Sequence, residues 1–323
     1  MQKNIYITRK IPEAGLKLLR EKGITYDIGE FKHPPTKKEL VKALKKKSYD
    51  GVINFLTDKI DADVFDACPT AKIFANFAVG FDNIDIEEAK KRNICISNTP
   101  GTSSTAVAEH TVALMMALTT RLVEGDTFMR RGKYKGWDPN LLIGTDMKGK
   151  VIGLIGAGQI GTEVAKILHF GFGSNVIYSD ITPNPVLEQI TGPTRKETAE
   201  VLREADIVSL HVPLLPSTKH LINKETLATM KKSAFLINTS RGPVVDEKAL
   251  VEALEKDIIR GAALDVFEFE PKITKGLTKL PDIILTPHIA SSRQSARDMM
   301  AEIVAKNIIS VFERGVDINS VFA

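Results

Sequence analysis

The sequence predicts an α/β protein of two βα domains, in which a doubly wound parallel sheet is inserted into a smaller domain. Short β-rich apolar runs alternate with segments of helical period along the chain, which is typical of parallel sheets covered by helices. A connector rich in Gly, Trp and Pro, residues 132–150, separates a first series of such units from a second. The second series contains six candidate strands, enough for a complete doubly wound sheet.

Length and composition support this class. The 323 residues are 43% hydrophobic and 26% charged, which suits two globular domains. No window is apolar enough to cross a bilayer and no leader precedes the first strand, so we expect a cytoplasmic protein without a membrane segment. Cys68 and Cys95 belong to no Cys/His cluster, so we expect reduced core thiols, with a disulfide as the lesser alternative, and no metal site.

The net charge of +4 is modest, and its lysines are scattered over helical faces. Nucleic-acid binding requires a denser basic stripe with interleaved aromatic residues. The sequence therefore predicts no nucleic-acid partner.

The first series begins directly at the N-terminus. Helical periods follow its first strand at residues 12–23 and its second at residues 36–51, and residues 104–134 form one long helical stretch. His110 lies inside that stretch, where we expect a packed or surface residue. The strands are expected at residues 4–8, 26–30, 50–57, 71–79 and 94–101.

In the second series, apolar runs again alternate with helical segments, and a final amphipathic stretch, residues 295–315, could return to the first domain. We therefore expect a discontinuous first domain, residues 1–99 and 292–323, around a second domain, residues 100–291. The strands of the second domain are expected at residues 151–156, 175–180, 206–212, 234–240, 261–267 and 282–288.

A glycine motif follows the first strand of the second domain. In "VIGLIGAGQIG", Gly156 can make a tight turn, Gly158 lets the backbone approach a pyrophosphate, and Gly161 allows close packing of helix on strand. The helix that starts there offers free N–H groups to phosphates. The next strand ends at Asp180, whose carboxylate can bind ribose hydroxyls and repels a 2′-phosphate, so the motif favours NAD over NADP.

Three polar residues follow the carboxyl ends of later strands, where ligands bind in open parallel sheets. Arg241 can hold a carboxylate with two donors, His288 can transfer a proton, and Glu270 can orient and charge that imidazole. A histidine at a strand end is more often structural when taken alone. Next to a hydride carrier, however, this set suits the reduction of a carbonyl beside a carboxylate.

At this point the sequence resembles the D-isomer-specific 2-hydroxyacid dehydrogenase family. The segments "GAGQIG", "HVPLLPSTKHLIN", "INTSRGPVVDEKALVEAL", "GAALDVFEFEP" and "ILTPHIAS" match it in order and spacing, from about residue 50 to residue 315. The resemblance implies a Rossmann NAD domain within a smaller flavodoxin-like substrate domain. It also implies that Arg241 binds substrate, that Glu270, directly before a proline, pairs with His288, and that His288 is the acid/base. Glu268 is the neighbouring glutamate that we reject for this role.

The resemblance extends to the ligand-binding residues. Val79 and Gly80 would present backbone N–H groups to the substrate carboxylate, although "AVG" also reads as an ordinary tight turn at a strand end. His211 should lie near the cofactor without moving a proton, and we leave His220 as structural or exposed. Gln159 and Ile160 would meet the pyrophosphate, and Val212, Thr239 and Asp265 would lie along the cofactor.

Within the family, "LTDKID" and "AVGFDNID" resemble the glyoxylate/hydroxypyruvate reductase branch. D-3-phosphoglycerate dehydrogenase and D-lactate dehydrogenase are the alternatives, and an NAD(H)-sensing binding protein similar to corepressors is the non-enzymatic one. The apolar helix around "VALMMALTT" and the segment through Trp137 predict a homodimer, in line with the family.

Overall fold

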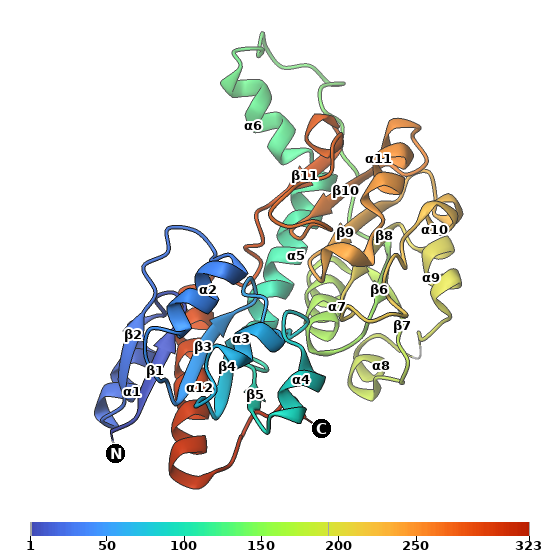
Figure 1. The fold of residues 1–323 in the computed structure, drawn as a ribbon. Coiled ribbons are helices and arrows are strands. Elements are labelled where there is room, and N and C mark those ends of the chain that lie inside the picture. The colour runs from blue at the N-terminus through green and yellow to red at the C-terminus, as the bar shows by residue number, and fades with distance from the viewer. Residues whose placement is uncertain (1, 193, 323) are drawn as a thin grey trace. The chain divides into compact units, whose positions relative to one another are not determined.

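The computed structural model describes residues 2–192 and 194–322, which divide into two compact units (Figure 1). Unit 1 contains the residues up to 103 and those from 292 onward, and unit 2 contains residues 104–291. Each unit has its own parallel sheet with helices packed on both faces, so the predicted α/β class is confirmed.

The sheet of unit 1 has the strand order β2-β1-β3-β4-β5, which is the order of flavodoxin-like sheets. All neighbouring strands are parallel. Their carboxyl ends consequently lie along one edge. The strands are β1 (Asn4–Ile7), β2 (Thr25–Ile28), β3 (Gly51–Phe55), β4 (Ile73–Phe77) and β5 (Cys95–Ser97).

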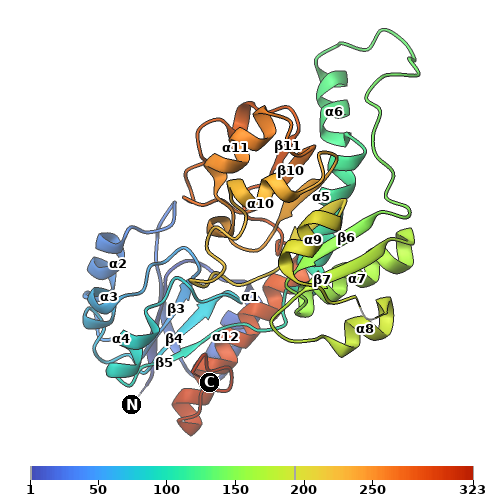
Figure 2. The ribbon, with the colours of Figure 1, turned by 90° about the vertical axis from the view of Figure 1, so that its right-hand side faces the viewer.

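Two hydrophobic clusters hold the helices of unit 1 to its sheet. One face packs against α2 (Lys37–Leu44), α3 (Ala62–Asp66) and α4 (Ile86–Lys91). The other packs against α1 (Glu13–Glu21) and α12 (Gln294–Arg314). Figure 2 shows α12, coloured red, beside β4 of this unit. The last long helix therefore belongs with the first residues of the chain.

The sheet of unit 2 is also entirely parallel, in the order β11-β10-β9-β8-β6-β7. One further position extends it beyond β7, because Tyr178 forms an isolated parallel bridge with Arg195. With that bridge as a minimal third strand, the order is 3-2-1-4-5-6-7, which is the 3-2-1-4-5-6 pattern of a Rossmann sheet with β11 added as a seventh strand. The named strands are β6 (Val151–Ile155), β7 (Asn175–Ser179), β8 (Ile207–Leu210), β9 (Phe235–Asn238), β10 (Gly261–Leu264) and β11 (Ile283–Leu285).

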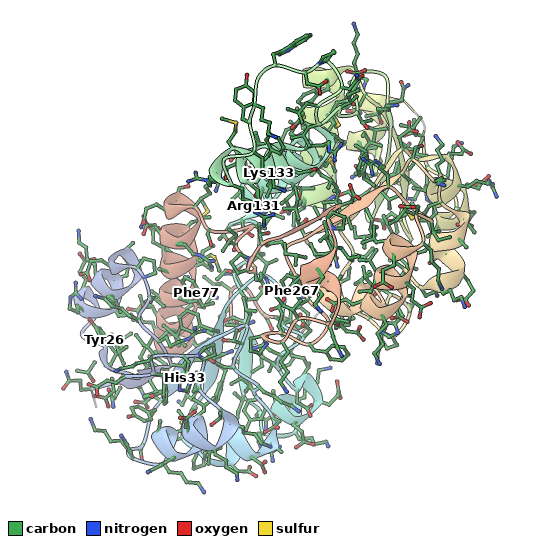
Figure 3. All side chains as sticks on the ribbon, turned by 90° about the horizontal axis from the view of Figure 1, so that it is seen from above. Tyr26, His33, Phe77, Arg131, Lys133 and Phe267 are labelled. Carbon is green, nitrogen blue, oxygen red and sulfur yellow. The ribbon has the colours of Figure 1, made fainter. Side chains whose placement is uncertain are left out.

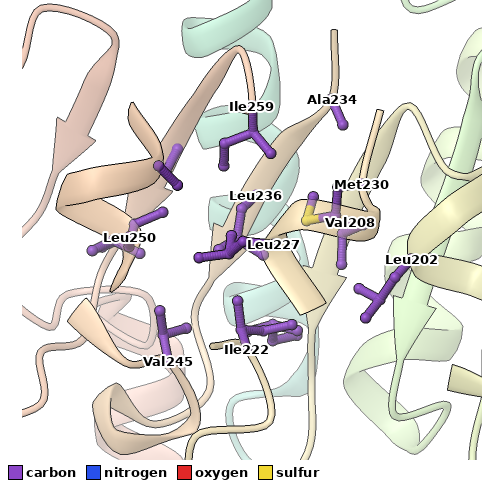
Figure 4. Packing of buried hydrophobic residues seen from close by; sticks show 14 of the residues in the cluster. Leu202, Val208, Ile222, Leu227, Met230, Ala234, Leu236, Val245, Leu250 and Ile259 are labelled. Atoms are coloured by element: carbon purple, nitrogen blue, oxygen red, sulfur yellow. The ribbon is translucent and has the colours of Figure 1, made fainter. Parts of the chain in front are cut away.

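The helices of unit 2 also divide between the two faces of its sheet. The cluster in Figure 4 lies on the face covered by α9 (Thr198–Glu204), α10 (Lys224–Thr229) and α11 (Glu247–Glu255). The opposite face packs against α5 (Ser104–Thr119), α7 (Gln159–Phe172) and α8 (Pro185–Thr191). Two short 3₁₀ segments, η1 (Gly242–Val244) and η2 (Leu277–Lys279), complete the unit.

The single long helix expected over residues 104–134 is wrong. The chain breaks after α5 at Arg121, which adopts a left-handed φ of 56°, and α6 (Leu122–Arg130) continues at an angle of 61°. The hydroxyls of Thr119 and Thr120 bond back to carbonyls of the preceding turn, a pattern that bends helices. Among the described residues no single helix is long and apolar enough to span a membrane.

Beyond this break, α6 and the connector that follows project from the rest of unit 2 (Figure 1 and Figure 2). Their apolar side chains are unusually accessible: Trp137 is 83% exposed, Leu122 65% and Met129 56%. Arg131 and Lys133, labelled in Figure 3, lie in the same stretch. We call residues 122–146 the arm.

Candidate active site

The glycine turn lies between β6 and α7. Gly156 has a φ of +94°, and a Cβ there would approach the backbone of His211 to 2.7 Å, so both the conformation and the space require glycine. A Cβ on Gly161 would lie 2.5 Å from the Gly156 carbonyl oxygen. At Gly158, by contrast, a Cβ would meet nothing within 4 Å. The turn is thus packed on its inner side and open at the N-terminus of α7.

Asp180 stands at the end of β7 beside this turn. Its Oδ2 accepts the backbone N–H of Ala157 at 2.7 Å, which ties the carboxylate to the glycine turn. Asn184 supports the same turn by donating to the hydroxyl of Thr162 at 2.9 Å. The guanidinium of Arg195 donates to the Asp180 carbonyl at 3.0 Å. Asn184 was not singled out in the sequence, where it is one of many polar loop residues.

His211 lies under the turn at the end of β8. Its backbone N–H donates to the Ile155 carbonyl at 2.7 Å, and its Nε2 lies 3.0 Å from the hydroxyl of Ser209. Desolvation lowers the pKa of His211 to about 4. The residue is therefore a neutral structural support at neutral pH.

The remaining residues expected along the cofactor lie around the same edge. Val212 follows β8, and its Cγ1 would lie 3.0 Å from a Cβ on Gly156. The hydroxyl of Thr239, after β9, is 2.8 Å from that of Thr111 on α5. Gln159 and Ile160 form the first turn of α7, where the Gln159 amide oxygen accepts from Ser104 at 3.0 Å.

Three neighbouring strands deliver the expected catalytic residues to one edge. Arg241 follows β9, Glu270 follows β10 and His288 follows β11, and these strands are adjacent and parallel. Nδ1 of His288 lies 3.0 Å from Oε2 of Glu270. The other oxygen, Oε1, accepts the backbone N–H of Phe267 at 2.9 Å.

The charge on Glu270 is stabilised in this arrangement. Burial raises the pKa of the Glu270 carboxyl, but the hydrogen bond and charge of His288, the Phe267 N–H and the charge of Arg241 together outweigh burial. The net pKa is lower than usual, so the group is a carboxylate at neutral pH. A carboxylate on Nδ1 leaves Nε2 of His288 as the ring nitrogen for proton transfer.

Asp265 fixes the backbone that presents His288. This fully buried carboxylate accepts the N–H groups of Ile289 and Ala290 at 2.9 and 2.8 Å, and the Thr286 hydroxyl at 2.6 Å. His288 itself has a left-handed φ of 54° and donates its N–H to the Asp265 carbonyl. Burial raises the pKa of Asp265, yet the hydrogen bonds from His110, the Thr286 hydroxyl and the two N–H groups keep it below the usual value. Asp265 thus shapes the turn that carries the imidazole.

His110 contributes to this turn as well. Its Nε2 lies 3.3 Å from the Thr286 hydroxyl and 3.5 Å from Oδ1 of Asp265. The expectation of a packed helix residue therefore holds, but the packing is against the histidine turn. His110 and Thr286 are 176 positions apart in the sequence, so no local pattern indicates this contact.

In unit 1 the turn after β4 holds Val79 and Gly80. Their carbonyls are fixed by amide donors, Val79 by Asn98 at 2.7 Å and Gly80 by Asn76 at 2.8 Å. Within the described part of the chain, neither N–H group donates to a backbone carbonyl.

These residues fit a nicotinamide dinucleotide. The open space at Gly158 would leave room for a pyrophosphate, the first turn of α7 would supply N–H donors to it, and Asp180 would receive the ribose hydroxyls. A glycine turn of this kind, together with an imidazole hydrogen-bonded to a carboxylate at the same edge of the sheet, is typical of a dehydrogenase that uses a nicotinamide cofactor.

Comparison with known proteins gives the family. The model of the D-isomer specific 2-hydroxyacid dehydrogenase NAD-binding domain matches residues 112–290. A glyoxylate reductase of Thermofilum pendens is 47% identical over 315 residues, which is 96% of this chain and 91% of that protein. The chain belongs to the D-isomer specific 2-hydroxyacid dehydrogenase family and is an oxidoreductase acting on CH–OH donors.

Solved structures agree with this assignment. The TT0316 protein of Thermus thermophilus has a TM-score of 0.91 and 40% identity, with 98% of this chain and 99% of that chain covered. An NADPH-dependent glyoxylate/hydroxypyruvate reductase of Sinorhizobium meliloti, in complex with NADP and malonate, has a TM-score of 0.85 and 30% identity, with 100% and 97% covered. The predicted resemblance and Rossmann domain are confirmed.

Proposed function

We propose that this protein is an NADH-dependent reductase that converts small 2-oxo acids, glyoxylate and hydroxypyruvate first, into D-2-hydroxy acids. The observation that carries the proposal is the His288–Glu270 pair, which lies at the same sheet edge as Arg241. The names of the Thermofilum and Sinorhizobium relatives support the substrate class. D-3-phosphoglycerate and D-lactate dehydrogenase activities are the alternatives.

The proposed roles follow from the chemistry of each side chain. A nicotinamide cofactor held at the glycine turn and Asp180 would supply the hydride that the carbonyl carbon receives. Arg241 binds the substrate carboxylate and orients the carbonyl, and the N–H groups of Val79 and Gly80 are the carboxylate donors that unit 1 offers. His288 gives its Nε2 proton to the carbonyl oxygen as that oxygen gains charge, and the Glu270 carboxylate stabilises the imidazolium beforehand.

For the cofactor we propose NAD in preference to NADP. The Asp180 carboxylate is held beside the glycine turn by its bond to Ala157, where it would repel a 2′-phosphate. The Sinorhizobium relative uses NADPH. The preference therefore depends on this one side chain more than on the fold.

One experiment tests the substrate proposal. NADH oxidation is followed with glyoxylate, hydroxypyruvate, pyruvate, 3-phosphohydroxypyruvate and the uncharged ketone hydroxyacetone. We expect the first two to give the highest kcat/KM and hydroxyacetone to give almost none, because it lacks the carboxylate. Equal rates with hydroxyacetone would remove the carboxylate-binding roles. Tight NADH binding without turnover of any 2-oxo acid would favour an NAD(H)-sensing protein.

We further propose a cytoplasmic homodimer that buries the arm. Trp137, Leu122 and Met129 expose more apolar surface than a monomer normally leaves in water. Cys68 and Cys95 are free thiols, in keeping with a reducing compartment. Light scattering at micromolar concentration should give twice the chain mass of 35.5 kDa. A monomer mass would contradict the dimer.

A further inference from the structure

The segment that follows β10, residues 265–270, contacts histidines from three different parts of unit 2. Each of its three carboxylates lies within 3.5 Å of an imidazole nitrogen. One pair is the proposed acid/base couple, and a second fixes the histidine turn. The third pair contains Glu268, which the sequence analysis rejected as the catalytic glutamate, and His220, which it left as structural or exposed. The pairs are Asp265 with His110, Glu268 with His220, and Glu270 with His288.

The Glu268–His220 pair is the shortest of the three. Nε2 of His220 lies 2.7 Å from Oε1 of Glu268, and the glutamate side chain is only 10% exposed. His220 has a left-handed φ of 51° and donates its backbone N–H to the Pro243 carbonyl at 2.8 Å. The pair therefore joins the turn before α10 to the segment after β10.

Glu268 also joins this segment to the start of α11. Its backbone N–H donates to Oε1 of Glu247 at 2.8 Å, and its Oε2 accepts the Glu247 N–H at 3.4 Å. Glu247 is 1% exposed. Burying two carboxylates side by side is costly unless they are hydrogen-bonded, so the His220 imidazole and these N–H groups stabilise the arrangement.

The same segment is interlocked with the arginine turn. A Cβ on Gly242, the residue after Arg241, would lie 1.9 Å from the carbonyl carbon of Phe267 and 2.4 Å from the Glu268 nitrogen. No side chain fits between these backbones. A shift of Glu268 would therefore move both the Arg241 turn and the chain that leads to Glu270.

We propose that Glu268 and His220 are positioning residues that hold Glu270 under the His288 imidazole. The inference rests on the proposed function of that pair. Glu268 lies two residues before Glu270, and the N–H of Phe267, directly before Glu268, already donates to the Glu270 carboxylate. Without the contact to His220, this segment can shift. The Glu270 carboxylate then moves out of hydrogen-bond distance of His288 Nδ1.

Loss of the hydrogen bond between Glu270 and His288 should change the pH dependence of the reduction rate. The charged groups facing Glu270 are His288 and Arg241, and Asp265 with His110 lies at the base of the same turn. A displaced carboxylate favours the imidazolium less, so reduction should fail at a lower pH. A variant that merely lowers the amount of folded enzyme reduces the rate at every pH. It leaves unchanged the pH at which reduction declines on the alkaline side, which we call the alkaline limb.

The test compares Glu268→Ala and His220→Ala with the conservative Glu268→Gln and His220→Gln in the full-length enzyme. We expect the alanine variants to lose about 10- to 100-fold in kcat for glyoxylate, with KM for NADH within about twofold, as small misplacements of a catalytic group do. Their alkaline limb should move toward acid. The glutamine variants keep an acceptor or donor at the contact and should restore most of kcat. His33→Gln, an exposed histidine of unit 1, is the matched control.

Glu270→Gln is measured in parallel to separate the two hypotheses. If Glu270→Gln moves the limb and both alanine variants leave it unmoved, the positioning inference is wrong and the proposed function stands. If Glu270→Gln itself leaves the limb unmoved, the proposed catalytic pairing fails. Support requires the limb to move in the alanine variants and Glu268→Ala to add no further movement in the Glu270→Gln background.

Discussion

Glu270 approaches His288 from the neighbouring strand, with Oε2 at 3.0 Å from Nδ1, and its second oxygen is held by a backbone N–H. The carboxylate is thus fixed at both oxygens. Because the pKa of Glu270 lies below its usual value, its negative charge is present throughout the neutral and alkaline range. The His288 imidazole therefore faces a negative charge that stays the same over this pH range.

Replacing Glu270 by Gln keeps the shape and removes this charge. Reduction needs the protonated imidazole and oxidation the neutral one, so reduction falls as pH rises and oxidation increases. In Glu270→Gln the alkaline limb of reductive kcat/KM should move toward acid, because the negative charge that favours the imidazolium is gone. Steady-state rates of glyoxylate reduction, measured from acid to alkaline pH, give the position of the alkaline limb. A limb that stays in place would show that the imidazolium is stabilised by another group.

Replacing His288 by Asn should lower kcat by about 10²- to 10⁴-fold, the usual contribution of a positioned acid/base. Asparagine is the suitable replacement because it tolerates the left-handed backbone at this position. The dissociation constant for NADH, measured by fluorescence titration, should change little. Retention of more than a tenth of kcat would assign the proton transfer elsewhere.

Asp180→Asn tests the cofactor preference. Asparagine can still accept the Ala157 N–H but no longer repels a 2′-phosphate. A contact between two charges near a protein surface amounts to about 1 to 4 kcal/mol at 4 Å, so the NADH/NADPH ratio of kcat/KM should fall by at least about tenfold. Asp66→Ser, at a surface carboxylate of unit 1, should leave the ratio unchanged. Better use of NADPH by the unmodified enzyme would contradict the assignment of Asp180.

Asp317 makes a different prediction, about stability. Burial raises its pKa from 3.8 to about 6, and Oδ2 has no hydrogen-bond partner among the described residues. The folded state therefore binds the proton more tightly, and stability falls as pH rises from 3.8 to about 6. Asp317→Asn should raise the free energy of unfolding at about pH 7.5 by roughly 1 kcal/mol, a value reduced for partial exposure, and should change it little at about pH 4.

Thermal or urea unfolding at the two pH values measures this difference. The N–H of Asn319 donates to Oδ1 of Asp317 at 3.3 Å, and asparagine can keep that acceptor. An equal effect at both pH values would mean that packing, and not ionisation, controls the change.

Most of the fold could be predicted from the sequence, because each strand is recognisable from its own residues. Apolar runs bounded by turn residues marked all five strands of unit 1 and all six of unit 2. The break at Arg121 was missed, since residues 104–134 keep a helical period through it. The bridge at Arg195 was also missed, because a single paired residue leaves no periodic pattern.

For the candidate site, positions after strand ends were sufficient to bring Arg241, Glu270 and His288 to one edge. Contacts between distant segments were not predictable in this way. The pairing of Glu268 with His220 joins residues 48 positions apart and depends on tertiary packing alone. Glu268 was rejected as the catalytic glutamate because the glutamate of the family that the sequence resembles directly precedes a proline, here Pro271, but nothing local indicated the partner of Glu268.

The position of α12 determines the order in which the two units can be completed during translation. Residues 294–314 leave the ribosome after all of residues 104–291, yet they supply Met300, Val304 and Ile308 to the core of unit 1. Unit 2 therefore has its whole sheet and both helical layers while unit 1 still lacks part of one layer. In the nascent chain the second unit can fold first, and the face of the unit 1 sheet that α12 covers stays partly uncovered in that interval.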